Sequence, residues 1–428
     1  MKVAGWAGYP VSHSKVSTPN SIEDLKSIVC QTKGPAIARA QGRSYGDSSI
    51  SSDIFLLNKI NNILQFDTVN GILEIQAGIS IQQLLPIIIS KGWFLPVTPG
   101  TKFVSIGGLI ASDVHGKNHH NSGCLSEHIL SMKLLLGTGD IIECSKDNQS
   151  DLFHASCGGM GLTGVIISAK LKLKPIASSI ISESKQKVKS LEETIELFET
   201  NNSTYTYSWI DCLSPEVRSI VSFGEHAEVG RLVYKKKSTF SLPFNAPSSL
   251  LNHTAINIVN EFYFRKANLH QQERDILSFF YPLDLFKSWK ELYGKKGFIQ
   301  YQFVLPYKEG LFGLKKIIEE ISKRELIPVM SSLKKLAPKN KNLLSFPIDG
   351  YTLAMDFQRT DSLTAHLSTL NDLVVDFGGK IYLTKDSFLS EKHFKKMYRK
   401  WEEFEEVREK YGALGKFSSQ QSYRLGLK

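Results

Sequence analysis

The sequence predicts an α+β protein of two domains, the second of which is built on an antiparallel sheet. The first observation is length, because 428 residues exceed what one hydrophobic core usually holds. The second is the distribution of glycine: glycine-rich loops follow short strands up to about residue 176, and the chain beyond lacks such loops. The third is that the later chain reads as longer strands and helices with frequent aromatic residues. We therefore expect a domain boundary near residue 176.

The first 100 residues contain two predicted helices and one hairpin. Apolar residues at helical spacing after an Asn/Ser cap predict a helix over 20–32, and Ser80 caps a second helix over 80–91. PAIARA at 35–40 is predicted to be a short buried strand. Alternating apolar residues around Val69-Asn70-Gly71 predict a β-hairpin.

The strand over 35–40 runs directly into a glycine loop, QGRSYGDSS. Gly42 and Gly46 bracket Arg43, Ser44 and Tyr45, and backbone N–H groups in such a loop can bind phosphate while Arg43 adds charge. The pattern is neither a Walker loop nor a Rossmann fingerprint. Taken alone, it is equally compatible with a hairpin turn.

The stretch GGLIASDVHGKNHHNSG at 107–123 is the strongest functional signal. It follows a turn at Pro99-Gly100, and SIGG is expected to open a short helix. Its imidazoles, amine and amide can recognise a ligand's polar edge or move protons, so we interpret it as an active-site loop. No carboxylate or cysteine stands at ligand spacing from these histidines, so we expect no metal site. The side chains concerned are His115, Lys117, Asn118, His119 and His120.

Another hairpin is predicted over 129–145, turning at 137–140. A second glycine cluster follows and leads into a strand of alternating apolar and lysine residues that ends at Pro175. The glycines of this cluster are Gly158, Gly159, Gly161 and Gly164.

Four aromatic-rich segments of the second half are interpreted as strands and connectors. With Gln300, Gln302 and Arg265 among them, they can form a wall for a sugar, although ordinary packing of a sheet on helices explains the same aromatics. The segments are 208–213, 261–266, 279–286 and 297–306.

Helices over 308–323 and 361–376 complete the second domain. The chain then ends in a strand over 380–387 that carries Lys385, a charged helix over 390–410 and a final SYRLGLK.

Composition limits the partners. The net charge of +10 suits phosphate-bearing ligands or an anionic membrane, but the lysines are scattered, with the densest run at 235–237, so we expect no nucleic-acid binding. Five cysteines without CxxC spacing indicate free thiols in a reducing compartment. With no targeting signal and no spanning segment in view, we expect a cytoplasmic protein that can contact the inner face of the membrane.

Several motifs in order resemble one family. GRSYGDSS, PGTKFVSIGGLIASDVHGKNHH, CGGMGLTGVI, FIQYQFVLP, IYLTKDS and the C-terminal SYRLGL together resemble the decaprenylphosphoryl-β-D-ribose 2′-oxidases, which are vanillyl-alcohol-oxidase-type FAD proteins. The resemblance covers essentially the whole chain. It implies a two-subdomain FAD-binding domain of PCMH type (1–176, with 380–428 returning to it) and an inserted α+β substrate domain (177–379).

The resemblance also implies roles for individual residues. Lys385, His115 and Tyr45 would be catalytic, and the substrate would be bound by His115, Lys117, Gln300, Gln302, Lys335 and Lys385. The FAD would be bound non-covalently, because the first loop lacks the histidine that bonds flavin in many relatives. The residues expected to contact FAD are Gly42, Arg43, Ser44, Tyr45, Gly46, Asp47, Pro99, Gly100, Thr101, Gly107, Gly108, Asp113, His115, Gly116, Asn118, Gly123, Gly159, Gly161, Gly164, Val165 and Ile166.

The implied reaction takes hydride from C2′ of a polyprenyl-phosphoryl-β-D-ribose to flavin N5, which gives a 2′-keto sugar. An NADH-dependent reductase partner would complete epimerisation to the arabinose form. The family's best-known member has a cysteine where this chain has Ala354, so reagents that bond that thiol should not bond here. Two alternatives remain: the same fold acting on a free sugar alcohol or aldonolactone, and a carbohydrate-binding protein that kept the fold without chemistry.

Overall fold

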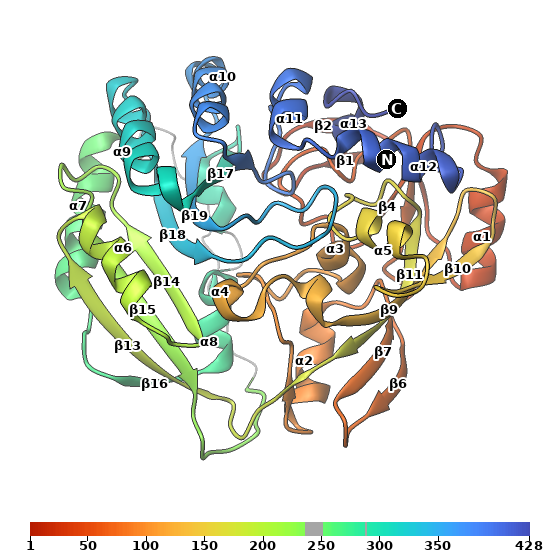
Figure 1. The fold of residues 1–428 in the computed structure, drawn as a ribbon, viewed down its shortest axis with the longest axis horizontal. Coiled ribbons are helices and arrows are strands. Elements are labelled where there is room, and N and C mark those ends of the chain that lie inside the picture. The colour runs from red at the N-terminus through yellow and green to blue at the C-terminus, as the bar shows by residue number, and fades with distance from the viewer. Residues whose placement is uncertain (236–250, 287–288) are drawn as a thin grey trace.

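The computed structural model describes residues 1–235, 251–286 and 289–428. In Figure 1 the elements up to β11 lie on the right and strands β13 to β16 on the left, with helices α9 to α13 along the top. Both chain termini lie among these upper elements. The fold is α+β, as predicted, with an antiparallel sheet as its largest element.

The first part of the chain contains a parallel sheet of order β3-β5-β4 and an antiparallel sheet of order β10-β9-β11-β7-β6. Both predicted hairpins are confirmed as β6–β7 and β9–β10. Two small antiparallel pairs, β1-β2 and β12-β8, complete this part. The strands are β1 (Lys2–Ala4), β2 (Val11–His13), β3 (Lys15–Ser17), β4 (Ala36–Arg39), β5 (Asp53–Leu56), β6 (Ile63–Asp67), β7 (Ile72–Gln76), β8 (Trp93–Phe94), β9 (Ile129–Leu135), β10 (Ile141–Cys144), β11 (Val165–Lys172) and β12 (Lys174–Pro175).

The predicted helix starts in this part are confirmed by their caps. Ser21 accepts from the Asp24 N–H, and Ser80 forms a capping box with Gln83. Ser105 accepts from the Gly108 N–H, which starts the short helix expected at SIGG. The helices are α1 (Ile22–Gln31), α2 (Ile81–Ile89), α3 (Ile106–Ala111), α4 (His119–Ser122), the 3₁₀ turn η1 (Leu125–His128) and α5 (Ser150–Ser156).

The second part is dominated by an eight-stranded antiparallel sheet of order β16-β13-β15-β14-β18-β19-β17-β20. In its register Gln300 lies opposite Asp356 and Gln302 opposite Ala354, so these four side chains share one face. Its strands are β13 (Ile180–Val188), β14 (Tyr205–Ile210), β15 (Ser219–His226), β16 (Gln272–Asp275), β17 (Phe298–Pro306), β18 (Met330–Leu336), β19 (Gly350–Gln358) and β20 (Lys380–Ile381).

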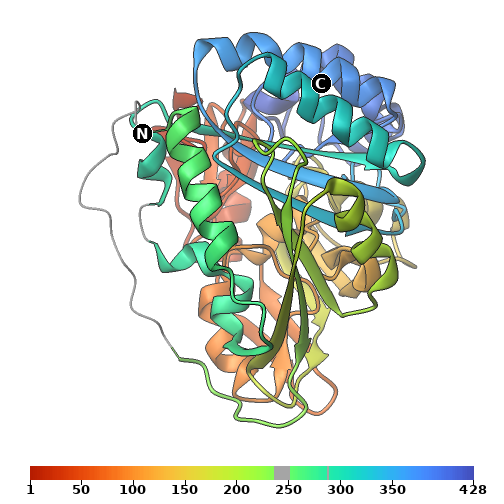
Figure 2. The ribbon, with the colours of Figure 1, turned by 90° about the vertical axis from the view of Figure 1, so that its left-hand side faces the viewer.

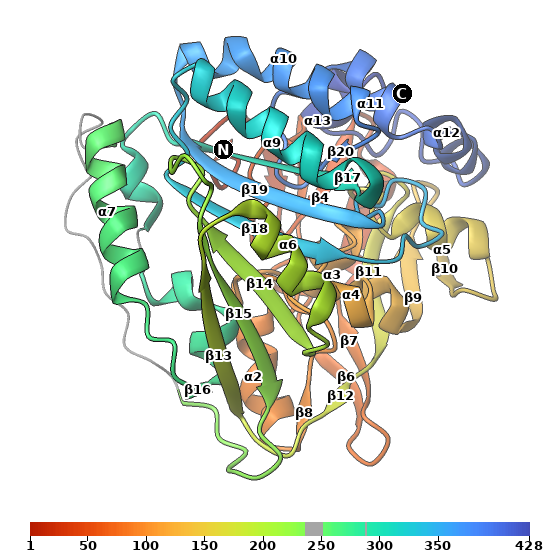
Figure 3. The ribbon, with the colours of Figure 1, turned by 60° about the vertical axis from the view of Figure 1, so that its left-hand side comes forward.

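Helices α9 and α10 lie side by side across one face of this sheet (Figure 3), and both predictions are confirmed to within a residue or two. Figure 2 shows the same two helices above the sheet, with α7 standing upright at its side. The helical elements are α6 (Leu191–Thr200), α7 (His253–Lys266), α8 (Ile276–Phe280), η3 (Pro282–Leu285), η4 (Trp289–Tyr293), α9 (Tyr307–Lys323) and α10 (Asp361–Asp376).

Two aromatic segments interpreted as strands and connectors are helical instead. Residues 261–266 are the last turns of α7, which buries Ile256 and Asn260 one turn apart and packs Tyr263 on Trp209. Residues 279–286 span the end of α8 and η3, because Asp275 caps this helix by accepting from two backbone N–H groups.

The C-terminal segment also differs from its prediction. Of the strand expected over 380–387, only β20 (Lys380–Ile381) pairs with a neighbouring strand. The chain then turns, which leaves Lys385 on a loop. The expected helix over 390–410 is two helices, α11 (Glu391–Met397) and α12 (Trp401–Lys410), because buried Tyr398 turns inward and donates to the Ile381 carbonyl. A last helix, α13 (Gln420–Arg424), follows a segment that hydrogen-bonds β4 at Ala36.

All five cysteines are free, and only Cys30 is exposed. None of the helices in the described part of the chain combines the length and the apolar character that crossing a bilayer requires. In the basic run 235–237 only Lys235 belongs to the described residues.

Candidate active site

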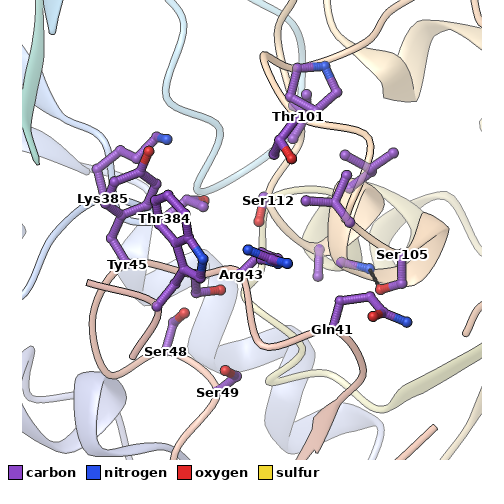
Figure 4. Close-up of a pocket in the computed structure, with 18 of the residues that line it drawn as sticks. Gln41, Arg43, Tyr45, Ser48, Ser49, Thr101, Ser105, Ser112, Thr384 and Lys385 are labelled. Atoms are coloured by element: carbon purple, nitrogen blue, oxygen red, sulfur yellow. Dashed lines mark hydrogen bonds between the residues drawn. The ribbon is translucent and has the colours of Figure 1, made fainter. Parts of the chain in front are cut away.

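A cavity of about 360 Å³ is lined by residues from both parts of the chain (Figure 4). One wall comes from the first glycine loop, the turn at residue 99 and α3, and the opposite wall comes from β17, β18 and β19. The predicted residues that line the cavity are Gly42, Arg43, Ser44, Tyr45, Pro99, Gly100, Thr101, Gly107, Gly108, His115, Gly161, Gly164, Ile166, Gln300, Gln302 and Lys385.

The first loop needs glycine because a side chain has no room there. Gly42 adopts φ +58°, and a Cβ on it would lie 2.3 Å from the guanidinium of Arg39. Arg39 in turn donates to the carbonyls of Ala4 and Ser49, so it cannot easily move away. The loop is thereby held with its backbone at the cavity.

Arg43 projects into the middle of the cavity (Figure 4). Its guanidinium lies 5.6 Å from the ring centroid of Trp6 and 5.2 Å from that of Phe103. Burial lowers the pKa of Arg43, while the nearby Asp284 carboxylate raises it. An arginine keeps its charge under these conditions, so the cavity holds a fixed positive charge.

Asp284, which the sequence analysis did not identify, ties the turn at residue 99 to the second part of the chain. Its Oδ1 accepts from Thr101 Oγ1 at 2.7 Å, and its Oδ2 accepts from the Lys102 N–H at 2.8 Å. This carboxylate of the second part of the chain therefore fixes the shape of the Pro99–Lys102 turn in the first part.

The sheet wall follows from strand alternation. Gln300, Gln302, Ala354 and Asp356 face the cavity from β17 and β19, and β18 adds Lys334. Gln300 Nε2 donates to Asp356 Oδ1 at 2.6 Å, which orients both groups.

The structure places Lys334 at the cavity, and Lys335 elsewhere. Successive residues of a strand point to opposite faces, so the Lys335 ammonium emerges beyond the other face and pairs with Glu199 at 2.7 Å. Burial lowers the pKa of Lys334 to about 8. Lys335, expected to contact substrate, therefore does not line the cavity, whereas its neighbour Lys334 does.

Lys385, Tyr45 and Asp356 form a cluster at one end of the cavity, in which Asp356 is buried and the other two are partly buried. The Lys385 ammonium lies 3.7 Å from the ring centroid of Tyr45, and the two side chains lie beside each other in Figure 4. Burial lowers the pKa of Lys385 to about 7, against the opposite effect of Asp356, and burial raises the pKa of Asp356 to about 6. At neutral pH this pair can hold or release one proton.

His115 is held by a directional hydrogen-bond chain. Thr352 donates its hydroxyl hydrogen to Phe303 O, so its oxygen accepts from Gln302 Nε2. The other hydrogen of that amide faces His115 Nε2 at 3.1 Å, so the imidazole carries its hydrogen on Nδ1. Burial, followed by the charge of Lys334, lowers the pKa of His115, which keeps the ring neutral. Its Nδ1 has no hydrogen-bond partner within the described residues.

The rest of the HGKNHH motif points away from the cavity. Lys117 Nζ donates to Phe279 O at 2.6 Å and lies 3.6 Å from the ring centroid of Tyr207. His119 Nδ1 accepts from the Ala337 N–H, and His120 Nε2 bonds Ser203 O. The substrate contact expected of Lys117 is therefore absent from the cavity wall, because the ammonium is held by aromatic rings and a carbonyl of the second part.

Eight residues expected at FAD do not line the cavity, and the contacts of several show a supporting role. Asp113 is fully buried and accepts from Asn340, Asn342 and Ser345, which fixes the loop after β18. Asn118 donates to Pro96 O behind the turn at residue 99. The residues outside the lining are Gly46, Asp47, Asp113, Gly116, Asn118, Gly123, Gly159 and Val165.

Comparison with known proteins identifies the family. Residues 14–145 match the family model described as an FAD binding domain. The chain is 33% identical over 413 residues to the decaprenylphosphoryl-β-D-ribose oxidase of Mycolicibacterium smegmatis, covering 91% of this chain and 89% of that protein. This chain belongs to the decaprenylphosphoryl-β-D-ribose oxidase family. It is therefore an FAD-dependent oxidoreductase acting on CH–OH groups.

More distant relatives match a smaller share of this chain. The L-gulonolactone oxidase of Bos taurus is 27% identical over 186 residues, which is 41% of each chain. The D-arabinono-1,4-lactone oxidase of Yarrowia lipolytica is 28% identical over 179 residues, or 40% of this chain and 34% of that protein.

The cavity fits FAD on its own chemistry. Backbone N–H groups of glycine-rich loops and the Arg43 cation suit a pyrophosphate. Gly107 could not carry a side chain, because a Cβ would lie 2.9 Å from that of Ala77. Lys385 and Lys334 supply positive charge at the sheet end, where a reduced isoalloxazine would carry negative charge.

Proposed function

We propose that this protein oxidises the 2′-hydroxyl of a polyprenyl-phosphoryl-β-D-ribose to the 2′-keto sugar, the first half of epimerisation to the arabinose form. The observation that carries the proposal is the extent of similarity. The match to a decaprenylphosphoryl-β-D-ribose oxidase spans 91% of the chain and so extends far beyond the FAD-binding part, whereas the lactone oxidases match 40–41%. Similarity that extends into the part with the sheet wall favours the same substrate class.

The FAD would be held non-covalently by the Gly42–Tyr45 loop, the Pro99–Thr101 turn and the Gly107–Gly108 helix start. When bound, it supplies the hydride acceptor. Arg43 would neutralise its pyrophosphate, Lys334 would place positive charge near its ring, and Lys385 would add to that charge once it has taken a proton.

The proton of the sugar hydroxyl would be taken by Lys385, aided by His115. A lysine whose pKa lies near neutrality has a free lone pair at physiological pH, and Asp356 beside it can share the proton it accepts. His115 Nε2 accepts from the amide of Gln302, so His115 would position Gln302, whose carbonyl oxygen would accept from the sugar hydroxyl. Lys334 would contact the substrate phosphate, because it is the other cation of the sheet wall.

We further propose that residues 1–176 and 380–428 form the FAD-binding unit and 177–379 the substrate unit. The hydrogen bonds between Ala36 of β4 and the segment 416–418 support the return of the C-terminus to the first unit. An NADH-dependent reductase partner would then reduce the keto sugar, and peripheral contact with a membrane would bring the lipid-linked substrate within reach.

A second candidate is oxidation of a free sugar alcohol or aldonolactone. The similarity to L-gulonolactone and D-arabinono-1,4-lactone oxidases favours it, because those relatives act on lactones without a lipid. The uncharged amides of Gln300 and Gln302 would serve either substrate.

The test is an anaerobic visible spectrum of the FAD-loaded protein before and after addition of a polyprenyl-phosphoryl ribose. Bleaching of the flavin bands by this compound, and not by free polyols or lactones, is the expected result. Bleaching by the free compounds alone would establish the second candidate instead. Flavin that no compound bleaches would show that the substrate belongs to neither class.

A further inference from the structure

Arg424 of α13 joins two buried carboxylates on two different loops. Its Nε donates to Asp47 Oδ2 at 3.0 Å, and its Nη2 donates to Asp47 Oδ1 at 2.7 Å. The same Nη2 lies 2.9 Å from Asp386 Oδ2. The Asp47 and Asp386 side chains are only 6% and 5% exposed, so solvent screens the repulsion between their charges only weakly.

The two bridged loops carry the two side chains that meet in the cavity. Asp47 stands two positions after Tyr45, and Asp386 directly follows Lys385. The Tyr45 N–H donates to Thr384 O at 3.1 Å, so the loops also touch through their backbones. Arg424 itself does not line the cavity, so it contacts the site only through these loops.

Helix α13 holds the Lys385 loop on both sides of that lysine. Gln421 Nε2 donates to Leu383 O at 2.7 Å, and Arg424 Nη1 donates to Leu389 O at 2.6 Å. Asp386 Oδ1 accepts from the N–H groups of Phe388 and Leu389, which leaves its Oδ2 for the guanidinium. The loop is therefore fixed by three contacts from one short helix.

The charges require an arginine at this position. Burial raises the pKa of Asp47 and its neighbour Asp386 adds to this, while Arg424 lowers it. Burial lowers the pKa of Arg424, but Asp386 and Asp47 more than compensate, so the pKa is raised overall. A planar guanidinium can hydrogen-bond one carboxylate and a carbonyl while it forms an ion pair with a second carboxylate, which a lysine ammonium of the same charge cannot do with the same geometry.

We propose that Arg424 is a positioning residue that holds Lys385 over Tyr45. It acts through Asp47 and Asp386, and its loss would leave two buried carboxylates facing each other and release the Lys385 loop. Only the effect on catalysis rests on the proposed function, because the position of Lys385 can be measured without substrate.

The experiment compares Arg424→Met with Arg408→Met in FAD-loaded protein. Arg408 is a matched control, because it is fully buried in α12 and donates to Leu162 O and Phe417 O without touching either loop. Each protein is treated with acetic anhydride at about pH 10, where a large share of the Lys385 amine is unprotonated whether or not the loop is released, and acetylation of Lys385 is followed by mass spectrometry. We expect labelling of Lys385 to rise at least about fivefold in Arg424→Met and to stay unchanged in Arg408→Met, since a lysine on a released loop becomes accessible to the reagent.

Unchanged Lys385 labelling in Arg424→Met, or an equal rise in Arg408→Met, would overturn the proposal. If Arg424→Met does not bind FAD, Arg424→Lys is used instead. Labelling of Lys385 between that of the parent and that of an exposed lysine is then expected, and labelling equal to that of the parent would overturn the proposal. A second readout is the pH midpoint of flavin reduction, which should move up towards the ordinary lysine range in the Arg424 variants only. The labelling needs no substrate, so failure of the proposed reaction leaves this test intact.

Discussion

Lys385 lies over the ring of Tyr45, with its Nζ 3.7 Å from the ring centroid and both side chains partly buried in the wall of the cavity. The two residues are 340 positions apart, and their loops are joined by the Tyr45 N–H and the Thr384 carbonyl. This contact brings the cofactor loop and the proposed base together.

Replacing the base should remove catalysis and leave the cofactor in place. We expect Lys385→Met to lower the rate of flavin reduction by roughly 10²–10⁴-fold, as for loss of a general base. In the parent protein the rate should rise as pH increases through about 7, because the pKa of Lys385 is lowered to that value and the neutral amine is the active form. Stopped-flow reduction under anaerobic conditions measures both.

The control for this change is Lys380→Met, because Lys380 is also partly buried and donates to Ser345 O outside the cavity lining. An equal loss of rate in both variants would show that Lys385 has no special role.

Two neighbours of Lys385 should shift its pH midpoint in opposite directions. Asp356 raises the pKa of Lys385 and Lys334 lowers it. The midpoint of flavin reduction should therefore move to lower pH in Asp356→Asn and to higher pH in Lys334→Met. Lys335→Met is the control, since Lys335 pairs with Glu199 away from the cavity and should leave the midpoint unchanged. Shifts of the same sign in both cavity variants would contradict the assigned cluster.

Gly46 keeps the Tyr45 loop and the Lys385 loop in contact. A Cβ at this position would lie 2.1 Å from Asp386 O, so Gly46→Ala should push the loops apart and cost about 1–3 kcal/mol of stability, as overpacking does elsewhere. Gly34→Ala provides the comparison, because its nearest neighbour would be at an ordinary 3.7 Å. Thermal unfolding measures the difference, and equal melting temperatures would show that the close contact relaxes without cost.

Ala354 gives the cavity a position for a chemical probe. Ala354→Cys should react with thiol reagents and keep its activity, because the side chain lines the cavity and hydride transfer uses no thiol. Cys30 is first changed to Ser, since it is the exposed natural cysteine, and burial raises the pKa of Cys144 to about 12. Mass spectrometry of the labelled protein, with and without FAD, locates the adduct. A thiol that never reacts would place Ala354 outside the accessible cavity.

Local signals in the sequence predicted much of the fold. Three helices begin at serine caps, Ser21, Ser80 and Ser105. Each cap bonds a backbone N–H three residues further on, so these helix starts could be predicted without tertiary information. The end of α7 was misinterpreted, because its aromatic residues also fit a strand. Only packing of Tyr263 on Trp209, which is distant in sequence, shows that they belong to a helix.

The cavity-lining glycines and Lys385 were predicted from motifs, but the sheet wall was only partly predicted. Whether Lys334 or Lys335 faces the cavity depends on the register of β18, and both residues lie in a strand whose two faces are covered. Asp284 and Asp356 carry no local motif, so only the structure identifies them as parts of the site.

The HGKNHH motif constrains how the enzyme opens. The loop with His115 is bound to the second part of the chain through Thr206 and Phe279 at Lys117, Ala337 at His119 and Ser203 at His120. A hinge motion separating the two parts would have to break all four hydrogen bonds and expose the Lys117 ammonium from between aromatic rings. The motif therefore acts as a clasp that opposes any hinge motion between the two parts.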